Sequence, residues 1–236
     1  MKKNIKYAFP KTLPVLFGYI FLGIAWGIVL ADAGYNYIWA FFISSFVYAG
    51  SMQFAMVPMM VASVSPITMA LTTLFVNGRH LFYGLSFVES FKKSKKMPYL
   101  IFGLTDETYS VLCGCKNEDP TEENRDAWFW ITCLDQSYWI IGSVLGALLG
   151  EFLPFDFTGI DFSMTALFAV ILIEQLLNNP KKNVLVAVFG MISAVVCLFV
   201  FGIDNFLLPS LLITVTFVFA FSFIFKNGIG GKKDAV

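Results

Sequence analysis

Two polar stretches decide the fold of this sequence: Tyr48-Ala49-Gly50-Ser51-Met52-Gln53-Phe54 and Asn77-Gly78-Arg79-His80. Each lies inside a long apolar run, the first from residue 37 to 62 and the second from 66 to 88. An arginine at the centre of a membrane helix costs about 2.5–3.5 kcal/mol on insertion scales. Such residues usually face a partner or a water-filled cavity rather than lipid. The two stretches therefore indicate a polar site inside a membrane protein.

The composition agrees with a membrane location. Of the 236 residues, 58% are hydrophobic and 14% are charged, and the mean hydropathy is +0.74. Soluble domains carry about 25% charged residues, so the sequence predicts an all-α, polytopic integral membrane protein. Lysines and arginines number 16, as do aspartates and glutamates, and this balance gives no sign of a nucleic-acid partner.

The apolar runs predict one transmembrane domain over residues 1–236. About 20 apolar residues span a bilayer, and eight segments meet or approach that length: 12–31, 37–62, 66–88, 97–115, 127–150, 163–179, 184–202 and 206–225. The run that follows the N-terminal lysines is too long for a secretory signal and predicts the first spanning helix. The first and fifth segments carry glycines at regular spacing, which predicts close helix packing; these are Gly18, Gly23, Gly27, Gly142, Gly146 and Gly150.

One or more of these segments is expected to be broken or re-entrant. The fourth has two adjacent carboxylates, Asp106 and Glu107, at its centre, which a straight lipid-exposed helix does not tolerate. With eight crossings and a cytoplasmic N-terminus, most loop lysines lie inside, but the cluster at residues 92–96 lies outside. That cluster violates the positive-inside rule, unless segment four and one of its two predecessors re-enter the membrane.

The first polar stretch has the features of a substrate site. Ala49-Gly50 lets the helix unwind, and the backbone groups freed in this way favour a carboxylate at the amides and an ammonium at the carbonyls. Tyr48, Ser51 and Gln53 add polar side chains. A zwitterion with an apolar side chain suits such a site. The alternative is that these side chains only form hydrogen bonds between packed helices.

The second stretch has the features of a charge network. A buried Arg79 needs an anionic partner, and we expect Asp106 or Glu107 to lie within salt-bridge reach, with Asp135 also available. Asn77 is assigned to the substrate site. His80 is the sole histidine, and its ordinary pKa of about 6.5 makes it a candidate for proton coupling. Alternatively, it is a structural residue.

Other chemistry has little support in the sequence. The chain lacks the phosphate-binding motif of ATP-driven machinery, so transport would be passive or driven by a gradient. The four cysteines do not have zinc-site spacing, and we expect neither a metal nor a cofactor. An enzyme is disfavoured, because only Asp106 and Glu107 offer an acid–base pair.

Several motifs occur in one order along residues 9–175: Leu13-Pro14, Gly18 with Gly23-Ile24-Ala25-Trp26-Gly27, the stretch 48–54, the stretch 77–80, Leu104-Thr105-Asp106-Glu107, and Gly159-Ile160-Asp161-Phe162 with Ala166-Leu167-Phe168. In these motifs the sequence resembles the AzlC-type branched-chain amino-acid exporters, also described as azaleucine-resistance permeases. Gly78 stands where that family is expected to have an apolar residue. The last two segments fit only as apolar spans.

This resemblance implies export of branched-chain or related small neutral amino acids across a bacterial cytoplasmic membrane. It also implies a small AzlD-type membrane partner, which this chain does not contain. The alternative function is a channel-like or structural membrane subunit whose polar residues only pack helices together.

Overall fold

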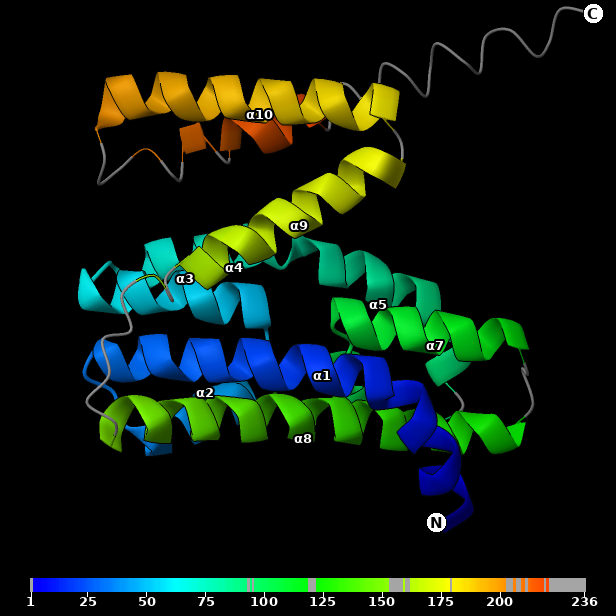
Figure 1. Ribbon diagram of the computed structural model, residues 1–236. Helices are drawn as coiled ribbons and strands as arrows, with labels where there is room; N and C mark the ends of the chain where they lie inside the picture. The colour runs from blue at the N-terminus through cyan, green and yellow to red at the C-terminus, as the bar shows by residue number, and fades with distance from the viewer. Residues whose placement is uncertain are drawn as a thin grey trace, which may run out of the picture. The chain divides into compact units, whose positions relative to one another are not determined.

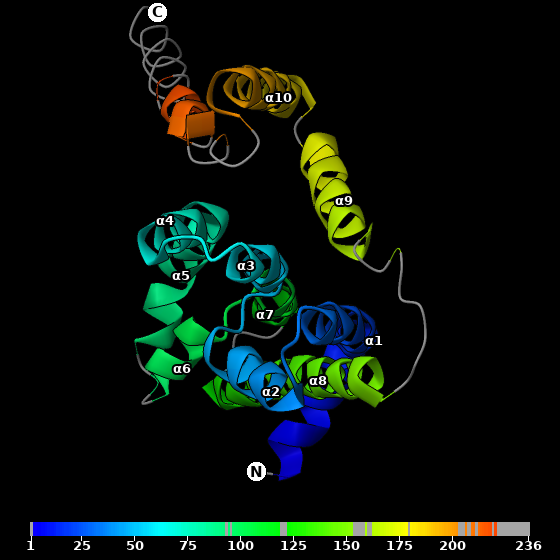
Figure 2. The same cartoon turned by 90° about the vertical axis from the view of Figure 1, so that its left-hand side faces the viewer.

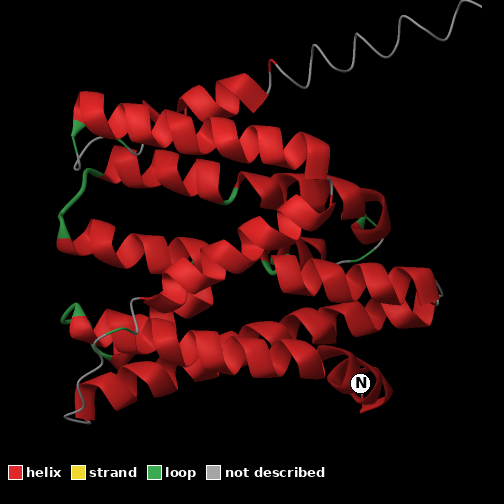
Figure 3. Ribbon diagram, turned by 45° about the horizontal axis from the view of Figure 1, so that its top comes forward, coloured by secondary structure: helices red, strands yellow, loops and turns green. Residues whose placement is uncertain are grey.

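The computed structural model describes residues 2–218 and residue 220, except for 93, 95, 119–121, 153–158, 160–161, 179, 203–205, 207–208 and 211. Within that part of the chain, every element of regular secondary structure is an α-helix (Figure 3). The predicted all-α class is therefore confirmed. The described helices are α1 (Lys2–Asp32), α2 (Tyr37–Phe46), α3 (Gly50–Val61), α4 (Pro66–Val76), α5 (Gly78–Phe91), α6 (Met97–Phe102), α7 (Asp106–Glu118), α8 (Glu122–Phe152), α9 (Phe162–Asn178) and α10 (Pro180–Phe201).

Three consecutive predicted segments are each split into two helices. The second becomes α2 and α3, the third becomes α4 and α5, and the fourth becomes α6 and α7. The prediction of broken segments is confirmed, and the breaks fall at the polar motifs. They leave shorter helices than the 20 residues that span a bilayer.

Two described helices are each long and apolar enough to cross a membrane: Lys3–Asp32 and Val184–Phe201. The count of eight segments stays a prediction. Large apolar side chains are exposed in each of the long helices; Phe21 of α1 is 71% exposed and Phe199 of α10 is 86% exposed. Exposed apolar side chains of this kind fit a lipid environment.

Helices α1 and α8 lie side by side in Figures 1 and 2, in contact along their length. Glycines let their backbones meet. A Cβ on Gly27 would collide with the Ser143 carbonyl oxygen and lie 2.5 Å from the Ala147 nitrogen, and one on Gly146 would lie 2.6 Å from the Ile24 Cα. Close packing is confirmed for five of the six glycines. At Gly18 the prediction is wrong, since an added Cβ meets nothing within 4 Å there.

The chain forms two compact units. The first comprises residues 1–69 and 76–167, and the second comprises 70–75 and 168–236. The first unit contains two clusters of buried side chains, one around Trp26, Phe54 and Trp139 and one around Phe87, Phe91 and Trp128. In the second unit, the rings of Phe189 and Phe217 stack 3.6 Å apart, and the Ser193 hydroxyl donates to the Ser210 carbonyl at 3.3 Å.

Candidate functional site

The first break separates α2 from α3 at residues 47–49. Tyr48 has a φ of 39°, in the left-handed region that non-glycine residues rarely adopt. Such strain costs about 1–3 kcal/mol and is most common at functional sites. Gly50 then starts α3 beneath Trp139, whose ring lies 3.1 Å from where a Cβ would stand. The expected disturbance of the helix near Gly50 is therefore confirmed.

Gln53 holds this break together. Its Oε1 accepts from the Ala49 backbone N–H at 3.2 Å and from Trp139 Nε1–H at 2.9 Å. Its Nε2–H donates to Ser44 Oγ at 3.2 Å. Gln53 is fully buried and Ser51 is 7% exposed. The amide thus joins α2, the break and α8, and the assignment of Gln53 and Ser51 to a substrate site stays a prediction.

A second side chain of α8 meets the same break. Gln136 Nε2–H donates to the Ser45 carbonyl at 3.0 Å, a group near the end of α2 where helical carbonyls lose their partners. Gln136 Oε1 accepts from the Tyr99 hydroxyl at 2.5 Å. Gln136 therefore connects the first break to α6.

The break between α6 and α7 covers residues 103–105. Thr105 Oγ1 accepts from the Thr108 backbone N–H at 3.3 Å, as an N-cap residue does. Asp106 and Glu107 follow in the first turn of α7, where the helix dipole stabilises negative charge. The adjacent carboxylates thus sit at a helix start, which is why the straight fourth segment does not form.

A chain of hydrogen bonds runs from this break into the protein interior. The Tyr19 hydroxyl lies 2.8 Å from Glu107 Oε2 and 2.6 Å from Thr105 Oγ1. Thr105 Oγ1 lies 3.1 Å from Thr108 Oγ1, which donates to Asp135 Oδ2 at 2.9 Å. Asp135 is fully buried. Of the predicted charged residues, Glu107 and Asp135 are thereby joined.

The remaining break lies at Asn77, between α4 and α5. The first turn of α5 brings His80 Nε2 to 3.8 Å from Asp106 Oδ1, and these side chains are 25% and 30% exposed. Tyr83 and Tyr109 stack nearby at 4.3 Å. The side chain of Arg79 lies outside the described residues, so its predicted pairing with Asp106 or Glu107 stays a prediction. His80 does reach Asp106.

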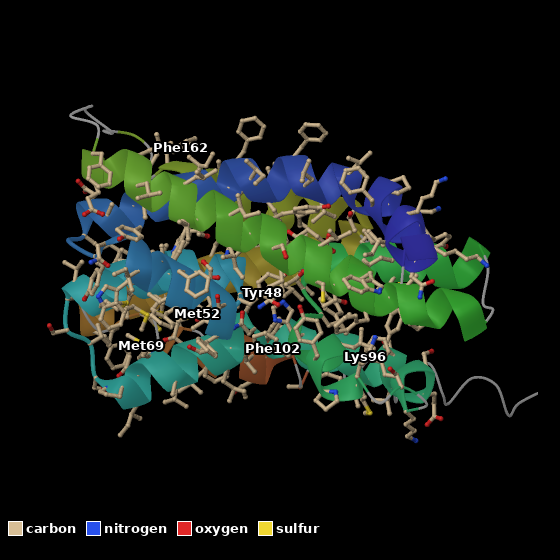
Figure 4. All side chains as sticks on the ribbon, turned by 90° about the horizontal axis from the view of Figure 1, so that it is seen from below. Tyr48, Met52, Met69, Lys96, Phe102 and Phe162 are labelled. Carbon is tan, nitrogen blue, oxygen red and sulfur yellow. The ribbon has the colours of Figure 1, made fainter. Side chains whose placement is uncertain are left out.

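The three breaks are neighbours in space. Figure 1 shows the starts of α3, α5 and α7 close together, with α3 extending to one side and α5 and α7 to the other. Figure 4 shows Tyr48 of the first break beside Phe102 of α6, and their ring centroids are 6.2 Å apart. The Tyr48 hydroxyl also lies near the hydroxyls of Tyr19 and Thr108. Three half-helices thus begin around one point.

Polar atoms are left without hydrogen bonds at this point. The buried Tyr48 hydroxyl, Asn77 Oδ1 and Asp135 Oδ1 make none of good geometry to the described residues. A buried polar atom without a partner costs about 1–3 kcal/mol, and such groups in a native structure call for an explanation. The Tyr48 hydroxyl and Asp135, which lie within electrostatic range of each other, offer a donor and an acceptor to a small polar ligand, and Asn77 Oδ1 offers a second acceptor at the break between α4 and α5. The described residues contain no group of three His, Cys, Asp or Glu side chains that could hold a metal ion.

Sequence reasoning missed five residues that build this region: Tyr19, Thr105, Thr108, Gln136 and Trp139. Tyr19 and Trp139 look like ordinary core aromatics within apolar helices. A signal existed for the threonines, because Thr105 and Thr108 flank two carboxylates at the spacing of a helix N-cap. Gln136 follows Asp135 directly, and two polar residues in mid-segment could have marked α8 as the inner helix.

The chain matches known proteins over most of its length. A family model described as "AzlC protein" matches residues 14–153. A protein of Helicobacter pylori strain 26695 named "Uncharacterized membrane protein" is 40% identical over 90% of this chain and 92% of its own length. No solved structure matches the chain.

Two further relatives have more informative names. The "Branched-chain amino acid transport protein AzlC" of Bacillus subtilis is 37% identical over 87% of this chain and 80% of its own length. The "Inner membrane protein YgaZ" of Escherichia coli is 27% identical over 78% of each chain. The family model's match over residues 14–153 includes all three breaks, and the matches together confirm the resemblance inferred from the motifs. This chain is a membrane protein that belongs to the AzlC family.

Proposed function

We propose that this chain exports branched-chain or related small neutral amino acids, driven by a gradient and together with a small AzlD-type membrane partner. The observation that carries the proposal is the meeting of three helix breaks around buried oxygens that lack hydrogen bonds. Carriers commonly build their binding sites from such discontinuous membrane helices. The name of the Bacillus subtilis relative supplies the substrate class.

The chemistry of a zwitterion fits this arrangement. The starts of α3, α5 and α7 carry the positive ends of their helix dipoles, which favour a carboxylate. The free oxygen of Asp135 is an acceptor for an ammonium group. Apolar side chains are at hand for an aliphatic substrate, since Met52 and Phe54 are each 1% exposed. Tyr48, Gly50, Ser51, Gln53 and Asn77 form the proposed substrate site.

Purified protein in vesicles, with and without the small partner, tests this function. The vesicles are loaded with labelled leucine, and efflux is followed at increasing leucine concentration and in the presence of unlabelled valine or lysine. A carrier of this class gives saturable efflux that valine inhibits and lysine does not. Efflux that rises linearly without competition indicates a channel. If leucine stays inside under every condition, the export proposal is wrong.

One observation favours the alternative of a structural subunit. The hydrogen bonds of Gln53 and Gln136 link helices to one another, as polar residues in packed membrane bundles do. Under this alternative, substitutions at Gln53 lower the stability of the protein. Vesicles then show no leucine flux with the unchanged protein or with the Gln53 variant. The flux of the unchanged protein therefore separates the two functions.

A further inference from the structure

The path from Glu107 to Asp135 contains four hydrogen-bonded links: Glu107 to Tyr19, Tyr19 to Thr105, Thr105 to Thr108, and Thr108 to Asp135. The three intermediate residues each bring one hydroxyl hydrogen, because a hydroxyl donates only once. Three hydrogens cannot fill four links. With both carboxyl groups ionised, one link joins two oxygens with no hydrogen between them.

The hydrogen-bond distances show which of the four links would lack a hydrogen when both carboxyl groups are ionised. When Tyr19 donates to Glu107 and Thr108 donates to Asp135, the Tyr19–Thr105 and Thr105–Thr108 links share one hydrogen. The oxygens of Tyr19 and Thr105 are 2.6 Å apart, and those of Thr105 and Thr108 are 3.1 Å apart. Both distances are those of hydrogen bonds. A fourth hydrogen, carried by one of the two carboxyl groups, fills every link.

We propose that Glu107, Tyr19, Thr105, Thr108 and Asp135 form a proton path that holds one transferable proton between its two carboxyl groups. In one state Glu107 is protonated and donates to Tyr19, Tyr19 to Thr105, Thr105 to Thr108, and Thr108 to the Asp135 carboxylate. In the other state all four hydrogen bonds point the opposite way. The states interconvert when each oxygen passes its hydrogen along, which leaves the net charge of the path unchanged.

The two carboxyl groups at the ends of this path differ in their burial and in their neighbours. Glu107 is half-buried and follows Asp106, which faces His80 of α5. Asp135 is fully buried on α8, with Tyr48 of the first break and Tyr99 of α6 within electrostatic range. The side chain of Arg79 is not among those described. The path therefore links the half-buried Glu107 at the start of α7 to the buried carboxylate whose second oxygen is open for an ammonium group, and its role in transport rests on the proposed function.

The shared proton has a spectroscopic signature that does not depend on transport. Infrared difference spectra of the protein in lipid membranes report protonated carboxyl groups through a C=O band that shifts in D2O. Asp135→Asn supplies an amide N–H that can donate to Thr108. Every hydroxyl of the path then donates toward Glu107, which ionises. Glu107→Gln does the same from the other end. We expect each single variant to lose the C=O band intensity of one protonated carboxyl group. The double variant should lose no more than either single variant.

Glu89→Gln is the matched control, because Glu89 is exposed and pairs with Lys92; it should leave this intensity unchanged. Additive losses in the double variant would mean two independent acids and would overturn the proposal. So would a loss in only one single variant, or in neither.

Transport gives a second test with a conservative pair at one position. Thr108→Val removes the oxygen that joins Thr105 to Asp135, whereas Thr108→Ser keeps it. In vesicles we expect Thr108→Val to lose the stimulation by a pH gradient, measured as the ratio of leucine flux with the gradient to leucine exchange at equal pH in the same preparation. Thr108→Ser should keep the ratio of the unchanged protein. Full stimulation in Thr108→Val would overturn the path. If the unchanged protein moves no leucine, the proposed function fails, and the infrared result still decides whether the proton is shared.

Discussion

The α1–α8 pair and the three broken segments use the same small residues in opposite ways. Gly23, Gly27 and Gly146 stay inside unbroken helices and bring two backbones into contact. Gly50 and Gly78 instead stand at helix starts, next to polar side chains. The long pair is held by packing, and the breaks between α2 and α3 and between α6 and α7 are held by hydrogen bonds from Gln53, Gln136 and Thr105. The comparison shows that the neighbours of a glycine, rather than the glycine itself, decide whether a membrane helix continues.

The two regions also meet, because α8 belongs to both. Its glycines pack on α1, and one to two turns earlier Asp135, Gln136 and Trp139 bind the breaks. Helix α1 contributes Tyr19 in the same way. A rigid pair that also carries polar anchors provides a frame against which shorter helices can move. Membrane carriers commonly work by moving one bundle against another around a fixed site.

The largest effect is expected where the packed pair is forced apart. In Gly146→Ala the new Cβ would collide with the Ile24 carbonyl oxygen and lie 2.6 Å from the Ile24 Cα. Backbone atoms cannot move aside as side chains do, so we expect a loss of about 3 kcal/mol or more in stability, at or above the usual range for overpacking. Thermal unfolding in detergent and the yield of folded protein measure it.

Gly18→Ala is the control on the same pair of helices, because nothing lies within 4 Å of the new Cβ. Alanine favours a helix over glycine by about 0.5–1 kcal/mol, so the control should be as stable as the unchanged protein or slightly more so. Equal destabilisation by the two substitutions would contradict the packing interpretation.

A smaller effect on stability, but a large one on flux, is expected at the first break. Gln53→Leu leaves the Trp139 indole N–H and the Ala49 backbone N–H buried without their acceptor, which costs about 1–3 kcal/mol. The protein should still reach the membrane, because the α1–α8 packing is intact. Leucine efflux from vesicles should fall by about tenfold or more, because the break that forms the proposed substrate site loses its supporting hydrogen bonds; each 1.4 kcal/mol added to the transport barrier lowers the rate about tenfold.

Met52→Leu is the neighbouring control, since it conserves volume in a buried apolar position and such swaps usually cost less than about 1.5 kcal/mol. If Gln53→Leu transports as well as this control, the amide is needed neither for the break nor for the substrate.

Much of this arrangement follows from the sequence, and the reasons differ by element. Glycine and polar residues inside apolar runs predicted breaks at Gly50 and at Asp106, because unpaired polar groups are costly in lipid. The bond from Thr108 to Asp135 spans 27 positions, and that from Tyr19 to Thr105 spans 86. Apolar helices in lipid have no polar face to set their rotation, so hydropathy does not indicate which side chains meet. Which side chains of two distant helices meet is therefore set by how the helices pack, and it is seen only in the structure.

The next prediction concerns Arg79 in the second broken segment. Arg79→Lys keeps the positive charge but loses the planar, five-donor fork that pairs with a carboxylate in two-point geometry. If Arg79 pairs with Asp106 or Glu107, leucine efflux should fall several-fold with little change in stability. Lys92→Arg is the reverse exchange in a surface pair with Glu89, where exposed ion pairs contribute only about 0–1 kcal/mol. It should leave efflux unchanged, and equal effects of the two exchanges would contradict a special role for the fork.

The smallest effect is expected at His80. Its Nε2 lies 3.8 Å from Asp106 Oδ1, and about a quarter of the side chain is exposed. This contact is an ion pair only when the imidazole is protonated, and His is the side chain that most readily changes charge between pH 5 and 8. If the pair takes part in proton coupling, His80→Gln should weaken the response of leucine efflux to an imposed pH gradient. Efflux at equal pH should persist, because glutamine keeps a hydrogen-bonding group at the start of α5. Vesicles with matched and opposed pH on the two sides measure both quantities in one preparation. A mutant that responds to the gradient as fully as the unchanged protein would show that His80 serves only the contact between α5 and α7.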